Sequence, residues 1–311
     1  MSDLPILITG AGGFICSEVA ATLATTGQHV IATDRNIDTP TAARLKDVEQ
    51  IAGPLTEVLT ALAGRRLSAV IHGAATTTPP EALGISRSAH LRLNFDPLTQ
   101  ALDTARSAGA TKFLFLSSMG VFAAEDGPAP GGKFTEATVP TAECAYCVAK
   151  RVGEIVTAAA AEPGFESLSL RLGNTCGPRE APRDTRPRVS RLRRMIDEAD
   201  GAGLIKLPTP NAMREWSWLP DLAQGIAALM AAPFGPRPVL HTGTPPSLQD
   251  LDLAKAVTER RPGTEIRITS PPEQATRPPM GTNAADGPFA SLDWTPIPQI
   301  LDQLMPIEAM S

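Results

Sequence analysis

A glycine-rich turn near the start of the chain constrains its fold more than any other feature. Gly10, Gly12 and Gly13 follow an apolar run at 5–9 and precede an Ala-rich helical pattern at 14–26. In this context glycines let backbone amides approach a diphosphate, and the helix that follows presents free N–H groups and the positive end of its dipole. The turn therefore predicts the first strand–helix unit of a dinucleotide-binding fold.

Apolar runs and helical stretches alternate through the first half of the chain. The runs lie at 29–34, 69–74, 112–118 and 167–172, and two of the stretches between them lie at 86–108 and 144–162. Runs that do not alternate strictly with polar residues are typical of strands buried on both faces, as in a parallel sheet covered by helices. We therefore predict the α/β class, with a Rossmann-type, doubly wound parallel sheet.

The composition changes after the last of these runs. Residues 177–194 carry three prolines and seven arginines, which indicates an inserted segment that contributes to substrate binding. We predict a Rossmann domain over 1–173, to which 213–243 returns. We also predict a smaller C-terminal substrate-binding lobe formed by 174–212 and 244–311.

Three further elements are predicted beyond that segment. A helix is expected at 219–233 with Asp221 as its cap, because Gln224 follows three residues later as in a capping box. A strand is expected at 238–243, where the sheet resumes, and a last helix near 297–305.

Composition and charge exclude several classes of partner. The 311 residues carry a net charge of −5 with a pI near 5.5, so we expect no broad cationic face and no nucleic-acid partner. Hydrophobic residues make up 42% and charged residues 20%, which is ordinary globular usage. No export signal and no apolar run of about 18 residues is visible, so we expect no membrane span and a cytoplasmic location.

The cysteines predict neither a disulfide framework nor a metal site. Cys16, Cys144, Cys147 and Cys176 are too few and too scattered for such a framework, and we expect reduced thiols. Cys144 and Cys147 form a C-x-x-C pattern, which also occurs in redox pairs and in halves of zinc sites. A zinc site needs about four ligands, and no second cysteine or histidine pair has suitable spacing. We therefore expect no metal and no redox pair.

An acidic residue ends the second predicted strand. Asp34 lies 24 residues after Gly10, where a carboxylate accepts hydrogen bonds from the hydroxyls of the adenosine ribose. The same carboxylate would repel the 2′-phosphate of NADP, so NAD is the preferred cofactor. Arg35 follows directly and is able to contact a phosphate, which leaves dual use open.

The only tyrosine of the chain, Tyr146, lies four residues before Lys150 within a helical pattern. Both side chains therefore lie on one face, one turn apart. A free phenol has a pKa near 10, and lowering that pKa by about three units takes roughly 4 kcal/mol. A nearby ammonium and a positively charged nicotinamide ring are able to supply this, so the pair predicts a general base. Taken alone, it also fits a core tyrosine and a solvated lysine.

Several motifs in order resemble the short-chain dehydrogenase/reductase superfamily, in its extended branch of NAD-dependent epimerases and dehydratases. The similarity covers nearly the whole chain. Besides the glycine turn and Ser117–Ser118, it rests on VIHGAA (70–75), YCVAK (146–150), RLGNTCGPR (171–179), REWSWLPDLAQGI (214–226) and LDWTP (292–296).

The resemblance implies a catalytic set. Tyr146 acts as base or acid, and Lys150 binds the nicotinamide ribose and lowers the tyrosine pKa. Ser118 hydrogen-bonds the substrate oxygen, and Asn94 supports the site through its helix. Cofactor contacts are implied at Gly10, Gly12, Gly13, Phe14, Ile15, Asp34, Arg35, Ala74, Ala75, Tyr146 and Lys150. A homodimer through the helices near 86–108 and 144–162 is implied as well.

The resemblance also points to an anionic, carbohydrate-derived substrate. Arg171, Asn174 and Arg214 occupy positions that resemble diphosphate contacts in nucleotide-sugar epimerases. Arginine forks suit phosphate or carboxylate oxygens. The predicted substrate-binding residues are Ser118, Asn174, Arg179 and Arg214, and further arginines that are able to line the entrance follow at Arg183, Arg186, Arg188, Arg191, Arg193 and Arg194.

Departures from the family pattern narrow the choice of reactions that the enzyme is expected to catalyse. Met119 and Gly120 stand where dehydratases of the branch carry an Asp-Glu pair, so elimination is disfavoured. Hydride transfer remains, either once in a dehydrogenase or forward and back in an epimerase. A dinucleotide-binding regulator without chemistry is the alternative. Cys16 stands where the third glycine is usual, so a thiol has to fit at a close helix–strand contact.

Overall fold

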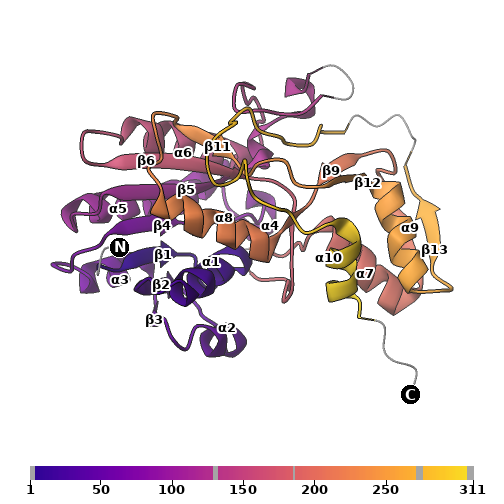
Figure 1. Ribbon diagram of the computed structural model, residues 1–311, viewed down its shortest axis with the longest axis horizontal. Coiled ribbons are helices and arrows are strands. Elements are labelled where there is room, and N and C mark those ends of the chain that lie inside the picture. The colour runs from indigo at the N-terminus through magenta and orange to yellow at the C-terminus, as the bar shows by residue number, and fades with distance from the viewer. Residues whose placement is uncertain (1–3, 129–131, 185, 271–275, 307–311) are drawn as a thin grey trace.

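A seven-stranded parallel sheet forms the centre of the computed structural model, which describes residues 4–128, 132–184, 186–270 and 276–306 (Figure 1). The strand order is β11-β6-β5-β4-β1-β2-β3. The strands are β1 (Ile6–Thr9), β2 (Val30–Asp34), β3 (Glu49–Ala52), β4 (Ala69–His72), β5 (Lys112–Ser118), β6 (Glu166–Leu172) and β11 (Val239–His241). The order reverses between β1 and β4, and ligands of such sheets bind outside the carboxyl ends of the strands at this point.

Helices cover both faces of this sheet. On one face α1 (Phe14–Thr25) packs against α8 (Leu219–Ala231), and their apolar residues share a buried cluster with β1 and β4. On the other face lie α3 (Leu55–Ala61), α5 (Arg87–Ser107) and α6 (Ala145–Ala159). Two shorter helices, α2 (Thr39–Arg44) and α4 (Pro80–Leu83), lie in the connections. The predicted α/β, doubly wound Rossmann-type sheet is confirmed.

A second buried cluster lies beside the sheet and gathers most of the later elements (Figure 1). They include α7 (Arg191–Ala202), β8 (Leu204–Leu207), α9 (Asp250–Arg260), β13 (Glu265–Ile268) and α10 (Ile297–Leu304). Short strand pairs join β7 (Thr175–Cys176) to β10 (Ser217–Trp218) and β9 (Met213–Glu215) to β12 (Ser247–Gln249). The division into a Rossmann domain and a substrate-binding lobe stays a prediction.

The predicted cap of α8 is wrong. The helix begins after Trp218, and its first turn contains Pro220, which lacks an N–H group and suits that position. Asp221 therefore lies inside the first turn, where its Oδ2 accepts a hydrogen bond from the backbone N–H of Thr295 at 2.7 Å. The carboxylate ties Thr295 to α8 instead of capping the helix.

Two buried histidines at strand ends make stability depend on pH. His72 and His241 are 0% exposed, and burial lowers their pKa values from 6.5 to about 3 and about 4. The unfolded chain binds protons at these residues near pH 6.5, whereas the folded chain does not. Their stabilising effect is therefore present above pH 6.5 and decreases as the pH falls toward the folded pKa values.

We expect each histidine to lower the free energy of unfolding by about 2 kcal/mol between pH 7 and pH 5. Urea unfolding of the wild type and of a His72→Gln variant at both pH values checks this. Glutamine does not titrate, and it keeps a polar group for Thr9, whose Oγ1 lies 2.8 Å from His72 Nδ1. Equal pH dependence of the two proteins would contradict the assignment.

Candidate active site

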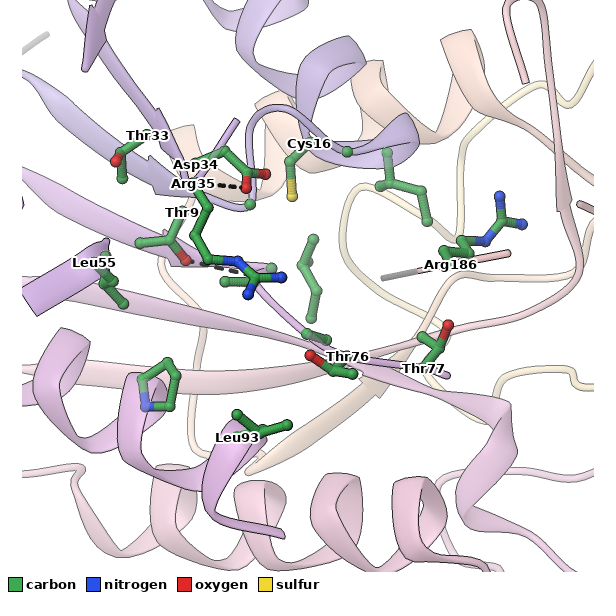
Figure 2. A pocket seen from close by; sticks show the side chains of 18 of the residues that line it. Thr9, Cys16, Thr33, Asp34, Arg35, Leu55, Thr76, Thr77, Leu93 and Arg186 are labelled. Atoms are coloured by element: carbon green, nitrogen blue, oxygen red, sulfur yellow. Dashed lines mark hydrogen bonds between the residues drawn. The ribbon is translucent and has the colours of Figure 1, made fainter. Parts of the chain in front are cut away.

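A cavity of about 530 Å³ opens at the carboxyl ends of β1, β2 and β4, at the point where the strand order reverses (Figure 2). All predicted cofactor residues except Gly12 line it. These are Gly10, Gly13, Phe14, Ile15, Asp34, Arg35, Ala74, Ala75, Tyr146 and Lys150. In Figure 2, Asp34 and Arg35 lie on one side of this space and Arg186 on the other.

The glycines of the turn are required by close backbone contacts. Gly10 has a φ of +77°, and a Cβ there would lie 2.6 Å from the backbone nitrogen of Ala74. A Cβ on Gly12 would lie 2.2 Å from the carbonyl oxygen of Asn36. Side chains at these positions would push the turn away from the strand ends. The glycines therefore let the turn lie directly against the strand ends, where α1 begins beside the cavity.

The Cys16 thiol fits because Gly73, directly after β4, has no side chain. A Cβ on Gly73 would lie 2.2 Å from Cys16 Sγ, so only glycine leaves room for the thiol. The departure from the usual third glycine of the turn is thus compensated directly after β4.

Asp34 is held by the glycine turn. Its Oδ2 accepts a hydrogen bond from the Gly12 N–H at 3.0 Å, and its Oδ1 accepts one from the Arg35 N–H at 2.7 Å. Burial raises the pKa of this carboxyl above its ordinary value, and the amide hydrogen bonds oppose that shift. The carboxylate is oriented before any ligand binds.

Tyr146 and Lys150 lie one turn apart on α6 and line the same cavity. The Lys150 Nζ lies 5.8 Å from the centre of the Tyr146 ring and donates a hydrogen bond to the Leu116 carbonyl at 2.7 Å. Burial lowers the pKa of Lys150 to about 8. The Ser118 hydroxyl acts on the Tyr146 phenol and lowers its pKa. The structure thus brings together the serine, tyrosine and lysine that the sequence predicts.

The expected easy ionisation of Tyr146, which includes the effect of a positive nicotinamide ring, stays a prediction. Burial raises the pKa of the phenol above 10.0, and the Ser118 hydroxyl and the Arg186 charge lower it less than burial raises it. Lys150 is not among the causes that act on the phenol, and its ammonium binds Leu116 instead.

Asn94 supports the cavity wall without lining it. Its Oδ1 accepts a hydrogen bond from the Thr76 N–H at 2.9 Å, and its Nδ2 donates to the carbonyls of Thr76 and His90. The side chain therefore fixes the loop after β4 to α5, and its supporting role in catalysis stays a prediction.

The predicted substrate residues lie outside the cavity lining. Arg179 is 55% exposed and pairs with Glu18, and Arg214 pairs with buried Asp250 at 2.8 Å. Asn174 donates from its side chain to Met119 and Glu215. These side chains are engaged with protein partners, and the structure does not gather them at the cavity.

Two other arginines of the same segment line the cavity. Arg183 bonds Asp38 at 3.2 Å and Thr41 at 3.3 Å, while the Asp184 carbonyl accepts a hydrogen bond from Thr78. We call the described residues 180–184 and 186–190 the crossing segment, because these contacts tie it to both sides of the cavity.

Arg186 keeps part of its guanidinium free. Its NH2 binds Glu180 at 2.9 Å, and its Cζ lies 5.4 Å from the centre of the Phe14 ring. Its NH1 is buried, and among the described residues it has no hydrogen-bond partner. In the sequence, Arg186 was one of several arginines in an Arg-rich segment, and nothing there indicated that it differs from the others.

A buried ion pair lies beneath the site and was not predicted. Arg171 donates from Nε and NH2 to the two carboxylate oxygens of Glu154 at 2.8 and 2.7 Å, and Ser117 Oγ donates to Glu154 at 2.6 Å. Arg171 is 4% exposed. The arginine therefore joins β6 to α6 and is not free to contact a diphosphate.

The expectation of reduced thiols is wrong for one pair. Cys144 and Cys147 form a disulfide across the first turn of α6, with their Cα atoms 5.0 Å apart. Two residues three apart at a helix start lie close enough for this bond, which spacing along the sequence did not reveal. Cys16 and Cys176 are free and buried.

Within the described part of the chain, no group of three or more histidine, cysteine or acidic residues is arranged to hold a metal ion. No helix in the same residues is long and apolar enough to cross a membrane.

Comparison with known proteins assigns the family. The model of the NAD dependent epimerase/dehydratase family matches residues 6–239. A UDP-glucose 4-epimerase of Erwinia amylovora is 26% identical over 256 residues, which are 71% of this chain and 72% of that protein.

Solved structures share the fold. The UDP-glucose 4-epimerase of Thermotoga maritima with UDP-glucose has a TM-score of 0.77 at 20% identity, covering 97% of this chain and 98% of that one. A double mutant of the dTDP-glucose 4,6-dehydratase of Streptomyces venezuelae, with NAD bound, has a TM-score of 0.72 at 20% identity, covering 94% of this chain and 91% of that one. Because the family model spans most of the chain, the protein belongs to the NAD-dependent epimerase/dehydratase family and is an enzyme of the short-chain dehydrogenase/reductase type.

Proposed function

We propose that this enzyme binds NAD and oxidises a secondary hydroxyl of a carbohydrate-derived, anionic substrate. One observation carries the proposal: the glycine turn, Asp34 and the Tyr146–Lys150 pair all open into the same cavity. A core tyrosine and a solvated lysine would not meet a phosphate turn and a ribose-binding acid in one space.

The residues present fit a dinucleotide. A Cβ at Gly10 or Gly12 would collide with the backbone of Ala74 or Asn36, so the glycines keep the turn at the strand ends, and the first residues of α1 line the cavity, where a helix start suits a diphosphate. Asp34 would accept hydrogen bonds from the adenosine ribose, and its charge supports NAD over NADP. Relatives of known structure bind NAD, as in the Streptomyces dehydratase. Arg35 also lines this end, so identification of the cofactor that the purified protein carries tests the preference.

The chain supplies proton transfer and orientation. NAD, when bound, accepts the hydride from the carbon that bears the reacting hydroxyl. Tyr146 takes the hydroxyl proton, and Ser118, which acts on the phenol, orients the same oxygen. Lys150 binds the nicotinamide ribose, and Asn94 holds the loop that lines this end of the cavity. Because the protein alone raises the pKa of Tyr146, the positive nicotinamide ring has to favour the phenolate.

The buried, unpaired NH1 of Arg186 supports an anionic ligand in the cavity. A buried donor without a partner is costly, and a phosphate or carboxylate oxygen would satisfy it. We therefore place the anion contact at Arg186. The predicted contacts at Asn174, Arg179 and Arg214 have less support, because each of these side chains already binds a protein partner.

Elimination has little support in this site. Met119 and Gly120 follow Ser118, and neither side chain is able to move a proton. The reaction is therefore either a single oxidation of a sugar or sugar acid, or the epimerisation of a nucleotide-sugar.

Assay of the purified enzyme with nucleotide-sugars and sugar acids distinguishes these reactions. Interconversion of epimers without net reduction of NAD indicates an epimerase, whereas accumulation of NADH with a sugar acid indicates a dehydrogenase. Binding of NAD without turnover of any substrate would contradict the proposal and indicate a non-catalytic regulator of the same fold.

We also propose a homodimer through α5 and α6. These helices pack together, and each carries a large exposed apolar side chain, Leu93 on α5 and Ile155 on α6, which a second copy would cover. Light scattering that reports a monomer would contradict this arrangement.

A further inference from the structure

The disulfide between Cys144 and Cys147 encloses the proposed general base. Only Ala145 and Tyr146 lie between the two cysteines, and all four residues belong to the start of α6. The Cα separation of 5.0 Å lies within the range that disulfides span. The bond therefore constrains the helical turn on which the tyrosine is mounted.

The two sulfur atoms differ in access. Cys144 is exposed and caps the helix, and its Sγ accepts a hydrogen bond from the Cys147 N–H at 3.1 Å. Cys147 is 3% exposed. The free N–H groups of a helix start stabilise a thiolate, so reduced Cys144 is suited to be the attacking sulfur and Cys147 the resolving one.

The other two cysteines lack these properties. Cys16 and Cys176 are buried, and burial raises the pKa values of both thiols, that of Cys16 to about 12. Neither is ionised near neutral pH. The chain thus contains two unreactive thiols that serve as internal controls for the pair.

We propose that Cys144 and Cys147 form a redox-active site that exchanges with low-molecular-weight disulfides and whose disulfide form fixes the turn carrying Tyr146. The Cys144 thiolate attacks one sulfur of the small disulfide and releases the first thiolate, which leaves a mixed disulfide. Cys147 then loses its proton to water and attacks Cys144 Sγ, which releases the second thiolate. Two cysteines are oxidised and one small disulfide is reduced to two thiols.

The coupling to Tyr146 follows from how α6 is anchored. Lys150 holds the second turn from below, through the Leu116 carbonyl and contact with the Phe115 ring at 4.5 Å. The first turn, with Tyr146, has the Cys144 cap and the disulfide instead. Reduction removes the covalent constraint, so that the cap and the packing of buried Ala145 and Cys147 remain to hold the turn. With Tyr146 as the proposed base, we expect reduction to lower kcat by about two- to fivefold, because the phenol is then held less firmly beside Ser118.

Thiol counting tests the exchange without any substrate. The full chain is equilibrated with mixtures of reduced and oxidised glutathione, quenched with an alkylating reagent and analysed by mass spectrometry. We expect Cys144 and Cys147 to gain and lose alkylation together, whereas Cys16 and Cys176 are labelled only after denaturation. A pair that stays fully reduced in excess oxidised glutathione, or that stops at the mixed disulfide, would overturn the proposal.

Matched variants separate the two sulfurs. Cys147→Ser is expected to accumulate glutathione on Cys144, because no resolving thiol remains. Cys144→Ser retains a capping oxygen and should acquire no glutathione. Glutathione found instead on Cys147 of the Cys144→Ser variant would overturn the assigned order of attack.

Amide exchange and activity both test the coupling. Only the activity measurement rests on the proposed function. We expect the amides of Cys147 and Val148 to exchange faster in reduced wild type and in Cys144→Ser than in the oxidised protein. Activity should follow the same order. Equal exchange in both redox forms would overturn the coupling even if the enzyme had another substrate.

Discussion

Replacement of Tyr146 by phenylalanine is expected to lower kcat by about a thousandfold, because general acid–base catalysis by one side chain contributes on this scale. The variant lacks only the phenol oxygen, and the ring still fills the space beside Ser118 and Gly120. Turnover of the substrate that the wild type accepts is the measurement. Full activity in this variant would refute the assignment of the base.

Two measurements show that the loss is chemical. The Kd for NAD should stay within about twofold of the wild type, because the glycine turn and Asp34 are unchanged. Ultraviolet titration reads the single tyrosine directly. Its pKa should be high in the protein alone and should fall when NAD binds, since the positive ring then opposes the effect of burial. A pKa that does not respond to NAD would contradict the proposed activation.

Replacement of Arg171 by leucine is expected to lower the free energy of unfolding by about 3–5 kcal/mol, because it leaves Glu154 charged, buried and without its main partner. Urea unfolding measures this change. The double variant Glu154→Leu/Arg171→Leu removes both charges and should be less destabilised than the single one. A double variant that loses the sum of both single effects would indicate that packing, and not the unpaired charge, dominates.

The matched control is Arg179→Leu. Arg179 also pairs with a glutamate, at 2.8 Å, but its side chain is 55% exposed. Ion pairs in contact with water contribute at most about 1 kcal/mol, so this variant should unfold almost like the wild type. Similar losses for Arg171→Leu and Arg179→Leu would contradict the argument from burial.

Features fixed by neighbours in the chain could be predicted from the sequence. The glycine turn, Asp34 at the end of β2 and the spacing of Tyr146 and Lys150 each depend on a few consecutive residues. The short edge strand β3 was missed, because its residues are partly exposed and lack a clear apolar run. The cap of α8 was misjudged because Pro220 and not Asp221 sets where that helix begins.

Features fixed by distant partners could not be predicted. Arg171 resembled a phosphate contact in the sequence, but its Nε and NH2 groups donate to Glu154 on α6. Arg183 and Arg186 both line the cavity, and Arg186 differs in its buried NH1, which has no hydrogen-bond partner among the described residues. The sign of the Tyr146 pKa shift depends on burial, which spacing to Lys150 does not encode.

The crossing segment has a consequence for how long a bound dinucleotide stays. Arg183 is tied to Asp38 and Thr41, and the Asp184 carbonyl is tied to Thr78, so we expect these contacts to slow the departure of the proposed dinucleotide. Slow departure suits a reaction cycle in which the reduced nucleotide is oxidised again before it leaves the protein. A rapid release of reduced nucleotide after each turnover would suit this architecture poorly.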